Sequence, residues 1–195
     1  MDPSQPSLFA PPAPPRPEGL SYRPSFISAE EEAALAQAIA ALPLRPFEFQ
    51  GYLGKRRVTS FGWRYVFDGS GLQEAEPVPD FLDAVRARAA ALMGVEPQAL
   101  AHVLLTEYAP GAGIGWHRDR SVFGDVVGIS LLAPARLRFR RRAGTKWERL
   151  TLEAEPRSAY LLSGPARYEW EHSIPEMEAL RYSVTFRTLK EAPKG

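Results

Sequence analysis

The second half of the chain, from residue 101 onward, is a series of short segments in which apolar and polar residues alternate. Alternation with a period of two is typical of β-strands with one buried face, and Gly, Pro and Ala-Gly turns separate the segments. Helical spacing of apolar residues occurs before this region, at about 29–41 and about 80–93. We therefore expect an α+β fold that is mainly β, an antiparallel barrel or jelly roll with two N-terminal helices packed on one side. The six expected strands cover residues 101–108, 125–132, 135–141, 147–153, 158–164 and 180–189.

One domain, residues 23–195, is expected to follow a disordered leader of residues 1–22. The first 20 residues hold seven of the 19 prolines and lack the basic start and apolar run of a signal peptide. No apolar stretch approaches the ~20 residues that a membrane-spanning helix needs, so we expect no membrane span and a cytoplasmic monomer. Between the two expected helices, the aromatic and glycine-rich segment 45–71 predicts short strands and a loop.

Three residues, His117, Asp119 and His172, have the types and spacing of a metal site. The chain has no cysteine, so His, Asp and Glu are the side chains left to hold a metal. In an extended strand, side chains two residues apart point to the same face, which puts His117 and Asp119 together, roughly 7 Å apart at the backbone. His172 is a better third ligand than His102, because it follows a predicted strand whose antiparallel neighbour would bring it alongside. Two histidines and one carboxylate form the facial triad of non-haem Fe(II) oxygenases, although a zinc hydrolase uses the same ligands and chance on a polar surface produces the same pattern.

Segment 181–187, Arg-Tyr-Ser-Val-Thr-Phe-Arg, sorts polar and apolar residues onto opposite faces of a strand. Arg181 and Arg187 are about 20 Å apart at the backbone, and two arginines leaning toward each other would bind the ends of a small dicarboxylate. Beside an iron site, this pattern indicates 2-oxoglutarate. The alternative is an exposed edge strand protected by its arginines. Thr106 and Tyr108, which share a face of the strand before the metal motif, favour the dicarboxylate.

Three blocks of sequence, residues 108–119, 163–175 and 181–187, resemble in content and order the AlkB family of Fe(II)/2-oxoglutarate-dependent dioxygenases. The resemblance runs from about Lys55 to Leu189. It implies a double-stranded β-helix (jelly-roll) core and the use of Fe(II), 2-oxoglutarate and O2. The family converts 2-oxoglutarate to succinate and CO2 and hydroxylates a carbon, often an N-methyl group that then leaves as formaldehyde.

The resemblance also implies roles for individual residues. It implies three iron ligands, which are His117, Asp119 and His172. It implies three anchors of 2-oxoglutarate, which are Tyr108 and Arg181 at the distal carboxylate and Arg187 at the end nearer the metal. Thr106 and Ser183 stand where family members commonly have Asn, so their contacts with the co-substrate are shorter hydroxyl contacts. Ser121 stands where the best-known bacterial repair enzymes place an acid against the methylated base, so their base specificity does not carry over.

Basic residues interleaved with aromatic ones indicate contact with nucleic acid. Segment 136–146 holds six basic residues and no acid, with Leu137 and Phe139 opposite the arginines, and a second basic run begins at Lys55. A charged edge strand and core aromatics explain the same pattern. Single strands are favoured as substrate, because a base inside a duplex must first be extruded. The candidate substrate residues are Trp63, Tyr65, Trp116 and Arg118.

These features predict a dioxygenase that oxidatively demethylates alkylated bases of DNA or RNA. The alternative is an AlkB-like hydroxylase of a tRNA modification or a protein side chain, without a repair role. A non-catalytic jelly-roll binding module would require the two histidines and the aspartate to be a coincidence.

Overall fold

The computed structural model describes residues 16–49, 52–66 and 71–190 of the chain. The helices are α1 (Ala29–Ala40), α2 (Asp83–Met93) and α3 (Gly164–Tyr168), with 3-10 turns at Asp80–Leu82 and Pro97–Ala99. The strands are β1 (Leu20–Arg23), β2 (Arg45–Phe49), β3 (Tyr52–Val66), β4 (Gly71–Glu74), β5 (His102–Tyr108), β6 (Ile114–His117), β7 (Phe123–Leu131), β8 (Ala135–Ala143), β9 (Lys146–Ala154), β10 (Ala159–Leu162), β11 (Glu171–Ile174) and β12 (Arg181–Leu189).

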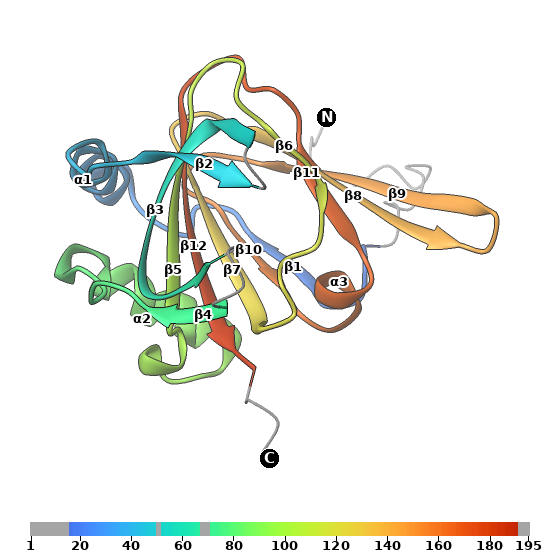
Figure 1. The fold of residues 1–195 in the computed structure, drawn as a ribbon, viewed down its shortest axis with the longest axis horizontal. Coiled ribbons are helices and arrows are strands. Elements are labelled where there is room, and N and C mark those ends of the chain that lie inside the picture. The colour runs from blue at the N-terminus through green and yellow to red at the C-terminus, as the bar shows by residue number, and fades with distance from the viewer. Residues whose placement is uncertain (1–15, 50–51, 67–70, 191–195) are drawn as a thin grey trace, which may run out of the picture.

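Two antiparallel sheets form the body of the fold (Figure 1). Within the described residues, the larger sheet has eight strands, in the order β1-β10-β7-β12-β5-β3-β2 with β4 paired to β3. The smaller sheet has the order β6-β11-β8-β9, and its hairpin of β8 and β9 projects from the body. Buried residues from both sheets, among them Tyr108, Val126, Leu137 and Phe139, form one hydrophobic cluster, so the sheets enclose a common interior. The chain is therefore mainly β, with the jelly-roll arrangement of two facing sheets.

The helices begin and end where local chemistry favours it. At the start of α1, Ser28 Oγ accepts from the backbone N–H of Glu31 at 3.2 Å, and Glu31 Oε2 accepts from the N–H of Ser28 at 2.8 Å. α2 ends at Gly94, whose φ of 71° lies in the left-handed region that glycine adopts without strain. Both helices start and stop within three residues of the sequence prediction.

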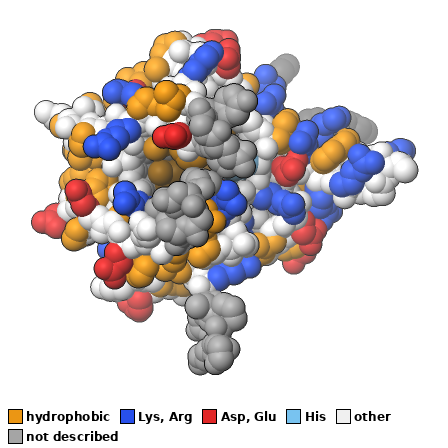
Figure 2. Space-filling model, in the orientation of Figure 1, with side chains coloured by type: hydrophobic (Ala, Val, Ile, Leu, Met, Phe, Trp, Pro, Cys, Tyr) orange, Lys and Arg blue, Asp and Glu red, His pale blue; other side chains and the backbone are white. Residues whose placement is uncertain are grey.

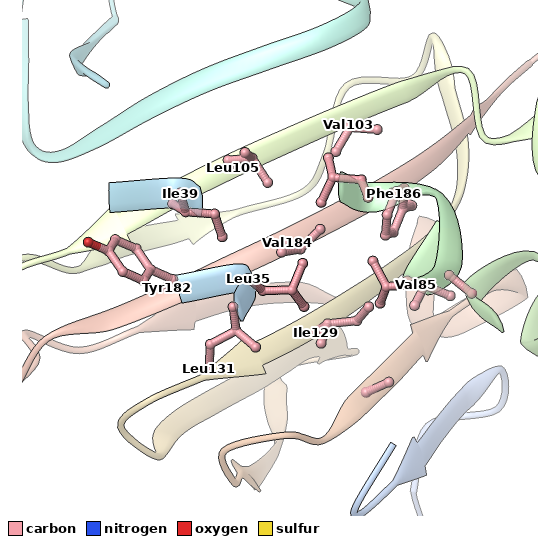
Figure 3. Close-up of a cluster of buried hydrophobic side chains, with 14 of the residues drawn as sticks. Leu35, Ile39, Val85, Val103, Leu105, Ile129, Leu131, Tyr182, Val184 and Phe186 are labelled. Carbon is pink, nitrogen blue, oxygen red and sulfur yellow. The ribbon is translucent and has the colours of Figure 1, made fainter. Parts of the chain in front are cut away.

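Alternation along β12 separates a hydrophobic core from a polar interior. Its even-numbered residues, such as Val184 and Phe186, pack with Leu35 and Ile39 of α1 and with Val85 of α2 (Figure 3). Its odd-numbered residues therefore face the other way, into the space between the sheets. These residues are Arg181, Ser183, Thr185 and Arg187, and all four are buried.

Two sequence predictions about the elements of the fold need correction. Segment 45–71 contains the short strand β2, as expected, but it also contains β3, a strand of 15 residues. β3 turns at Gly62, whose φ is 75°, from pairing with β5 to pairing with β4. The leader was expected to extend to residue 22, but Leu20–Arg23 form β1 and pair with β10, while residues 1–15 lie outside the described part of the chain. Strand β11 and helix α3 were not predicted. Among the described residues, no helix is long and apolar enough to cross a membrane.

Candidate metal centre

Strands β6 and β11 bring two of the predicted metal ligands together. They pair in the smaller sheet with His172 opposite His117, and the centroids of the two rings are 4.3 Å apart. β6 ends at His117, so Asp119 lies just after the strand, and the prediction that both residues share one strand was wrong. The ligand atoms of the three residues all lie within 4.8 Å of one another. His117 Nε2 is 3.8 Å from Asp119 Oδ1, within the separation of about 4 Å that two donors on one ion can have.

The glycine-rich run before the first histidine docks against the end of β11. Gly111 has a left-handed φ of 81°, and its N–H donates to the carbonyl of Met177 at 2.7 Å. A Cβ at Gly113 would lie 2.8 Å from the carbonyl oxygen of Ile174, so only glycine allows the two backbones to approach this closely. These glycines therefore hold β6 beside β11 in the register that brings the two histidines together.

The three side chains are in the protonation states that a metal requires. His117 Nδ1 lies 2.9 Å from the carbonyl oxygen of Gly115, and in the tautomer that donates to this oxygen Nε2 is left as the ligand atom. Burial lowers the pKa of His117 and lowers the pKa of His172 to about 3. Burial raises the pKa of Asp119, but the charge of Arg187 and its hydrogen bond act against burial, and this pKa lies well below its usual range. Two neutral imidazoles and a carboxylate therefore face one another near neutral pH.

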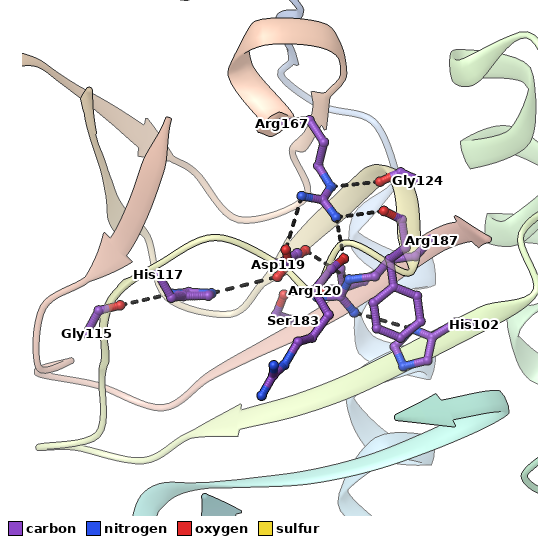
Figure 4. Close-up of polar contacts among 11 residues, drawn as sticks. His102, Gly115, His117, Asp119, Arg120, Gly124, Arg167, Ser183 and Arg187 are labelled. Atoms are coloured by element: carbon purple, nitrogen blue, oxygen red, sulfur yellow. Dashed lines mark hydrogen bonds and ion pairs between the residues drawn. The ribbon is translucent and has the colours of Figure 1, made fainter. Parts of the chain in front are cut away.

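A chain of polar contacts holds the Asp119 carboxylate (Figure 4). Arg187 Nε donates to Asp119 Oδ2 at 2.9 Å, and both side chains are 9% exposed. Nη1 of the same guanidinium lies 3.3 Å from Nδ1 of His102. Burial lowers the pKa of His102 well below its usual value, so this ring is neutral and its Nδ1 accepts. Sequence reasoning considered His102 only as a weaker candidate ligand, whereas the structure places it behind Arg187.

Arg167 of α3 fixes the loop that follows Asp119 (Figure 4). Its side chain is 3% exposed, and burial lowers its pKa. The guanidinium donates at 2.7 to 3.3 Å to four backbone carbonyls, those of Asp119, Arg120, Phe123 and Gly124. These bonds determine the path of the loop and therefore the position of the Asp119 backbone. Sequence reasoning missed Arg167, because a five-residue helix shows no periodicity.

Arg181 provides a second feature of the interior, a buried cation with free donors. β12 lies between β5 and β7, so the alternative of an exposed edge strand was wrong. Arg181 is 0% exposed, and its Nε donates to Ser130 Oγ at 2.9 Å. Its Nη1 and Nη2 have no hydrogen-bond partner among the described residues. Tyr108 is its partner on β5, with the ring centroid 5.1 Å from the guanidinium carbon. Two unpaired donors on a buried cation indicate a site for an anion.

Small and neutral polar side chains continue from Arg181 along the same interior face. Thr106 and Ser183 are paired across β5 and β12, and both are 3% exposed. Tyr160 of β10 lies nearby, and burial raises its pKa to about 12, so its phenol stays neutral. A Cβ at Gly128 would lie 2.3 Å from Tyr160 Oη, so this glycine makes room for the tyrosine ring. Sequence reasoning missed Tyr160, because nothing in the alternation of β10 distinguishes it from a core aromatic.

Trp116 and Arg118 do not face the metal ligands. Trp116 precedes His117 in β6, so the two side chains point to opposite faces of the smaller sheet. Trp116 instead lies against Arg140, with the ring centroid 4.4 Å from the guanidinium carbon. Arg118 is exposed and donates to the carbonyl of Tyr168 at 3.3 Å. Of the predicted substrate residues, Trp116 therefore lies on the face of the smaller sheet opposite the metal ligands.

Two further predicted substrate residues, Trp63 and Tyr65, lie on β3. Trp63 and Tyr65 are half-buried, and the Tyr65 ring lies 4.9 Å from the guanidinium carbon of Arg120, in the loop that Arg167 holds. Arg56 was not chosen as a site residue, yet the register of β3 on β5 puts it beside Tyr108. Its guanidinium carbon is 3.9 Å from the ring centroid of Phe47, and burial lowers its pKa. β3 therefore contributes aromatic and cationic groups next to the polar interior.

The basic segment 136–146 carries less free charge than its composition suggests. Leu137 and Phe139 are buried, as predicted, and the arginines alternate with them. Acids from β9 and from the chain around β11 pair with three of these arginines. The pairs are Arg136 with Glu153 at 3.5 Å, Arg140 with Glu171 at 2.6 Å, and Arg141 with Glu148 at 2.8 Å and with Glu169 at 2.6 Å.

A jelly roll with a His, His and Asp cluster and a buried arginine whose donors are free is the arrangement of a non-haem Fe(II) oxygenase with an acidic co-substrate. The family described as the 2OG-Fe(II) oxygenase superfamily matches residues 19–187. The chain belongs to this superfamily, and its curated relatives include AlkB homologues. The resemblance noted in the sequence is thereby confirmed, and enzymes of this superfamily use Fe(II) and 2-oxoglutarate.

Curated relatives and solved structures agree with this assignment. An "Alkylated DNA repair protein ALKBH8 homolog" of Arabidopsis thaliana is 29% identical over 90% of this chain and 59% of its own length. A Bos taurus "Alpha-ketoglutarate-dependent dioxygenase alkB homolog 7, mitochondrial" is 29% identical over 89% of this chain and 72% of its own length. The ALKBH8 methyltransferase of Mus musculus is 27% identical, and the match covers 81% of this chain but only 24% of that protein. The structure of OsALKBH1 superposes with a TM-score of 0.63 at 16% identity, over 89% of this chain and 97% of that one, and therefore supports the fold.

Proposed function

We propose that the chain is an Fe(II)/2-oxoglutarate-dependent dioxygenase that oxidatively demethylates alkylated bases of nucleic acids. In this proposal His117, Asp119 and His172 hold the metal, and Arg181 and Tyr108 hold the distal carboxylate of 2-oxoglutarate. The observation that carries the proposal is the buried Arg181 guanidinium, whose two terminal nitrogens lack partners in the same interior that holds the His, Asp and His cluster. A zinc hydrolase with the same three ligands would have no use for that cation.

The residues present fit both groups. When bound, Fe(II) and 2-oxoglutarate supply O2 activation coupled to decarboxylation of the co-substrate to succinate and CO2. Arg181 binds a carboxylate through two parallel N–H donors, which fixes the orientation of the dicarboxylate. Thr106 and Ser183 offer hydroxyl groups along its length, and Arg187 holds Asp119 while lying at the other end of the same strand. The closed sheet interior excludes water from these contacts, which strengthens them.

A nucleic-acid substrate is supported by the groups that β3 places beside the interior. In the proposed complex, 2-oxoglutarate neutralises Arg181 and Asp119 neutralises Arg187, so Arg56 is left to meet an anionic group of the substrate. The half-buried rings of Trp63 and Tyr65 offer surfaces for stacking a flipped or unpaired base, which favours single strands. The name of the Arabidopsis relative refers to repair of alkylated DNA, in agreement with this substrate class.

A second candidate function is hydroxylation of a tRNA modification without repair. Ser121 is exposed and neutral where the bacterial repair enzymes have an acid, which argues against their mode of recognising a cationic methylated base. The mouse relative is named a tRNA (carboxymethyluridine(34)-5-O)-methyltransferase, although the match covers only 24% of it. The cytoplasmic location and the monomeric state stay predictions.

The deciding experiment is a formaldehyde-release assay on methylated single-stranded and double-stranded DNA and RNA, with 2-oxoglutarate and Fe(II). Release from at least one methylated strand is expected, with His172→Ala as the inactive control. Succinate formation on bulk tRNA without any formaldehyde would favour the second candidate. Formaldehyde release that persists in His172→Ala would overturn the assignment of the metal site.

A further inference from the structure

The outer face of the smaller sheet carries a ladder in which arginine and tryptophan side chains alternate. The distances from guanidinium carbon to ring centroid are 5.2 Å for Arg138 on Trp116, 4.4 Å for Arg140 on Trp116, 4.6 Å for Arg140 on Trp147 and 5.5 Å for Arg142 on Trp147. Trp116 reaches from β6 and Trp147 from β9, so the ladder spans the whole sheet. We call these five residues the Arg-Trp ladder.

The ladder faces away from the candidate metal centre. Phe139 and Leu137, which alternate with its arginines along β8, are buried on the inner face, and Phe139 lies 6.2 Å from the ring of His172 between centroids. Trp147 is 37% exposed and Arg142 is exposed, at the end of the ladder on the projecting hairpin. In Figure 2, Lys and Arg side chains gather over this hairpin with hydrophobic and acidic side chains among them. The ladder therefore cannot take part in the catalytic site, and its hairpin end is open to a partner.

The charge of this face is positive in spite of its ion pairs. The register of β8 on β9 and β11 puts five arginines on the outer face, the three of the ladder together with Arg136 and Arg149, against the two acids Glu153 and Glu171. Arg138 is bonded to the neutral hydroxyl of Ser173, and Arg142 to the carbonyl of Gly144. No partner of Arg149 is found among the described residues. Three positive charges are thus left without a carboxylate.

We propose that the Arg-Trp ladder binds a stretch of single-stranded nucleic acid, as a second contact on the face of the smaller sheet that points away from the catalytic interior. Unpaired bases stack on planar aromatic and guanidinium groups, and their phosphates pair with the remaining arginines. An acidic peptide offers the charge but no flat faces to match the rings, and a duplex hides its base faces. If the strand bound by the ladder is the substrate of the enzyme, this role rests on the proposed function. Binding of a single strand to the ladder does not require catalysis.

The test is fluorescence anisotropy of metal-free full-length protein with a labelled 12-nucleotide single strand and with an abasic strand of the same length. The strand with bases should bind the unmodified protein at least roughly fivefold more tightly than the abasic strand, because the abasic strand cannot stack. Trp147→Ala should reduce this difference, although Trp63 and Tyr65 still offer surfaces for stacking, and Trp147→Phe should keep most of it. Arg142→Ala combined with Arg149→Ala should reduce the slope of log affinity against log salt by about 0.7 for each phosphate that the protein no longer neutralises.

Arg141→Ala is the matched control, because Arg141 lies in the same hairpin but points to the other face, where Glu148 and Glu169 flank it. It removes the same formal charge and should change the salt slope less than Arg142→Ala does. Equal effects of the two single variants, or equal binding of abasic and base-bearing strands, would overturn the proposal. These outcomes are independent of the formaldehyde assay, so the ladder and the proposed reaction fail separately. Unchanged thermal unfolding of each variant confirms that the hairpin is intact.

Discussion

Arg187 and Asp119 form a buried ion pair in which Nε donates to Oδ2 at 2.9 Å, leaving Oδ1 on the side of His117. The histidine is held by the same principle, since its Nδ1 is bonded to the carbonyl of Gly115 and Nε2 is left toward the aspartate. Each of these two side chains thus has one atom fixed by the protein and one atom presented to the centre. Supporting residues of this kind tune the affinity of a metal site as well as its geometry.

His102 should matter for metal affinity although it is not a ligand. His102→Leu removes the acceptor of Arg187 Nη1, so the guanidinium loses one of its two restraints, and we expect Fe(II) binding to weaken roughly tenfold. His102→Asn keeps an acceptor oxygen, so its affinity for Fe(II) should be close to that of the unmodified protein. Titration of the apoprotein with Fe(II) under anaerobic conditions measures the effect. Equal affinity of the Leu variant and the unmodified protein would contradict this role.

Arg181 should determine affinity for 2-oxoglutarate without affecting the metal. In Arg181→Met the dicarboxylate loses two charge-assisted hydrogen bonds, each worth about 1.5–3 kcal/mol, so its dissociation constant should rise by a factor of a hundred or more. Arg181→Lys keeps the charge, so it should lose less affinity for 2-oxoglutarate than Arg181→Met does. Isothermal titration of the metal-loaded protein with 2-oxoglutarate checks both values. A parallel loss of Fe(II) binding in the Met variant would point instead to a collapsed interior.

Gly113 and Gly115 form a matched pair in the glycine-rich run. A Cβ at Gly113 would lie 2.8 Å from the carbonyl oxygen of Ile174, whereas a Cβ at Gly115 would meet nothing within 4 Å. Gly113→Ala should therefore push β6 away from β11, lower the melting temperature by several degrees and weaken metal binding, since a steric clash of this kind costs about 1–3 kcal/mol. Gly115→Ala should change neither. Similar behaviour of both variants would show that the close approach has no role.

The metal-free protein should lose stability as the pH falls from 7 to 5. Burial lowers the pKa of His172 to about 3, while an unfolded histidine titrates near ~6.5. Between these values the unfolded chain binds a proton that the folded chain rejects, so the free energy of unfolding falls with the pH, by up to about 2 kcal/mol at pH 5 for this residue. Urea denaturation at both pH values measures the change. His172→Asn should show a smaller decrease, and an identical decrease would assign the effect to other groups.

The polar face of β12 and the choice of His117, Asp119 and His172 were predictable from the sequence, because both depend on residue type and local spacing. A period of two needs no knowledge of the neighbouring strands, and with three histidines in the chain few third ligands were possible. The strand that carries His172 was not predicted, and the strand that carries His117 ends before Asp119. β6 and β11 have four residues each, too few for a pattern to emerge, and they exist because they pair with each other.

What the sequence could not reveal depends on contacts between distant segments. The free charge of segment 136–146 was overestimated because Glu148, Glu169 and Glu171 lie outside it in sequence and next to it in space. Trp116 was predicted as a substrate residue, yet it adjoins a ligand in a strand, and neighbours in a strand face opposite sides. Arg167 supports the site through backbone carbonyls, which leave no trace in residue type.

An unsatisfied buried donor costs a protein about 1–3 kcal/mol, and Arg181 has two of them. The free energy of unfolding is therefore smaller for the chain without an anion at this position than for the chain with an anion bound. Occupation of the site by a dicarboxylate adds stability by mass action. The resistance of the purified protein to unfolding should then rise with the concentration of the dicarboxylate that fills this site.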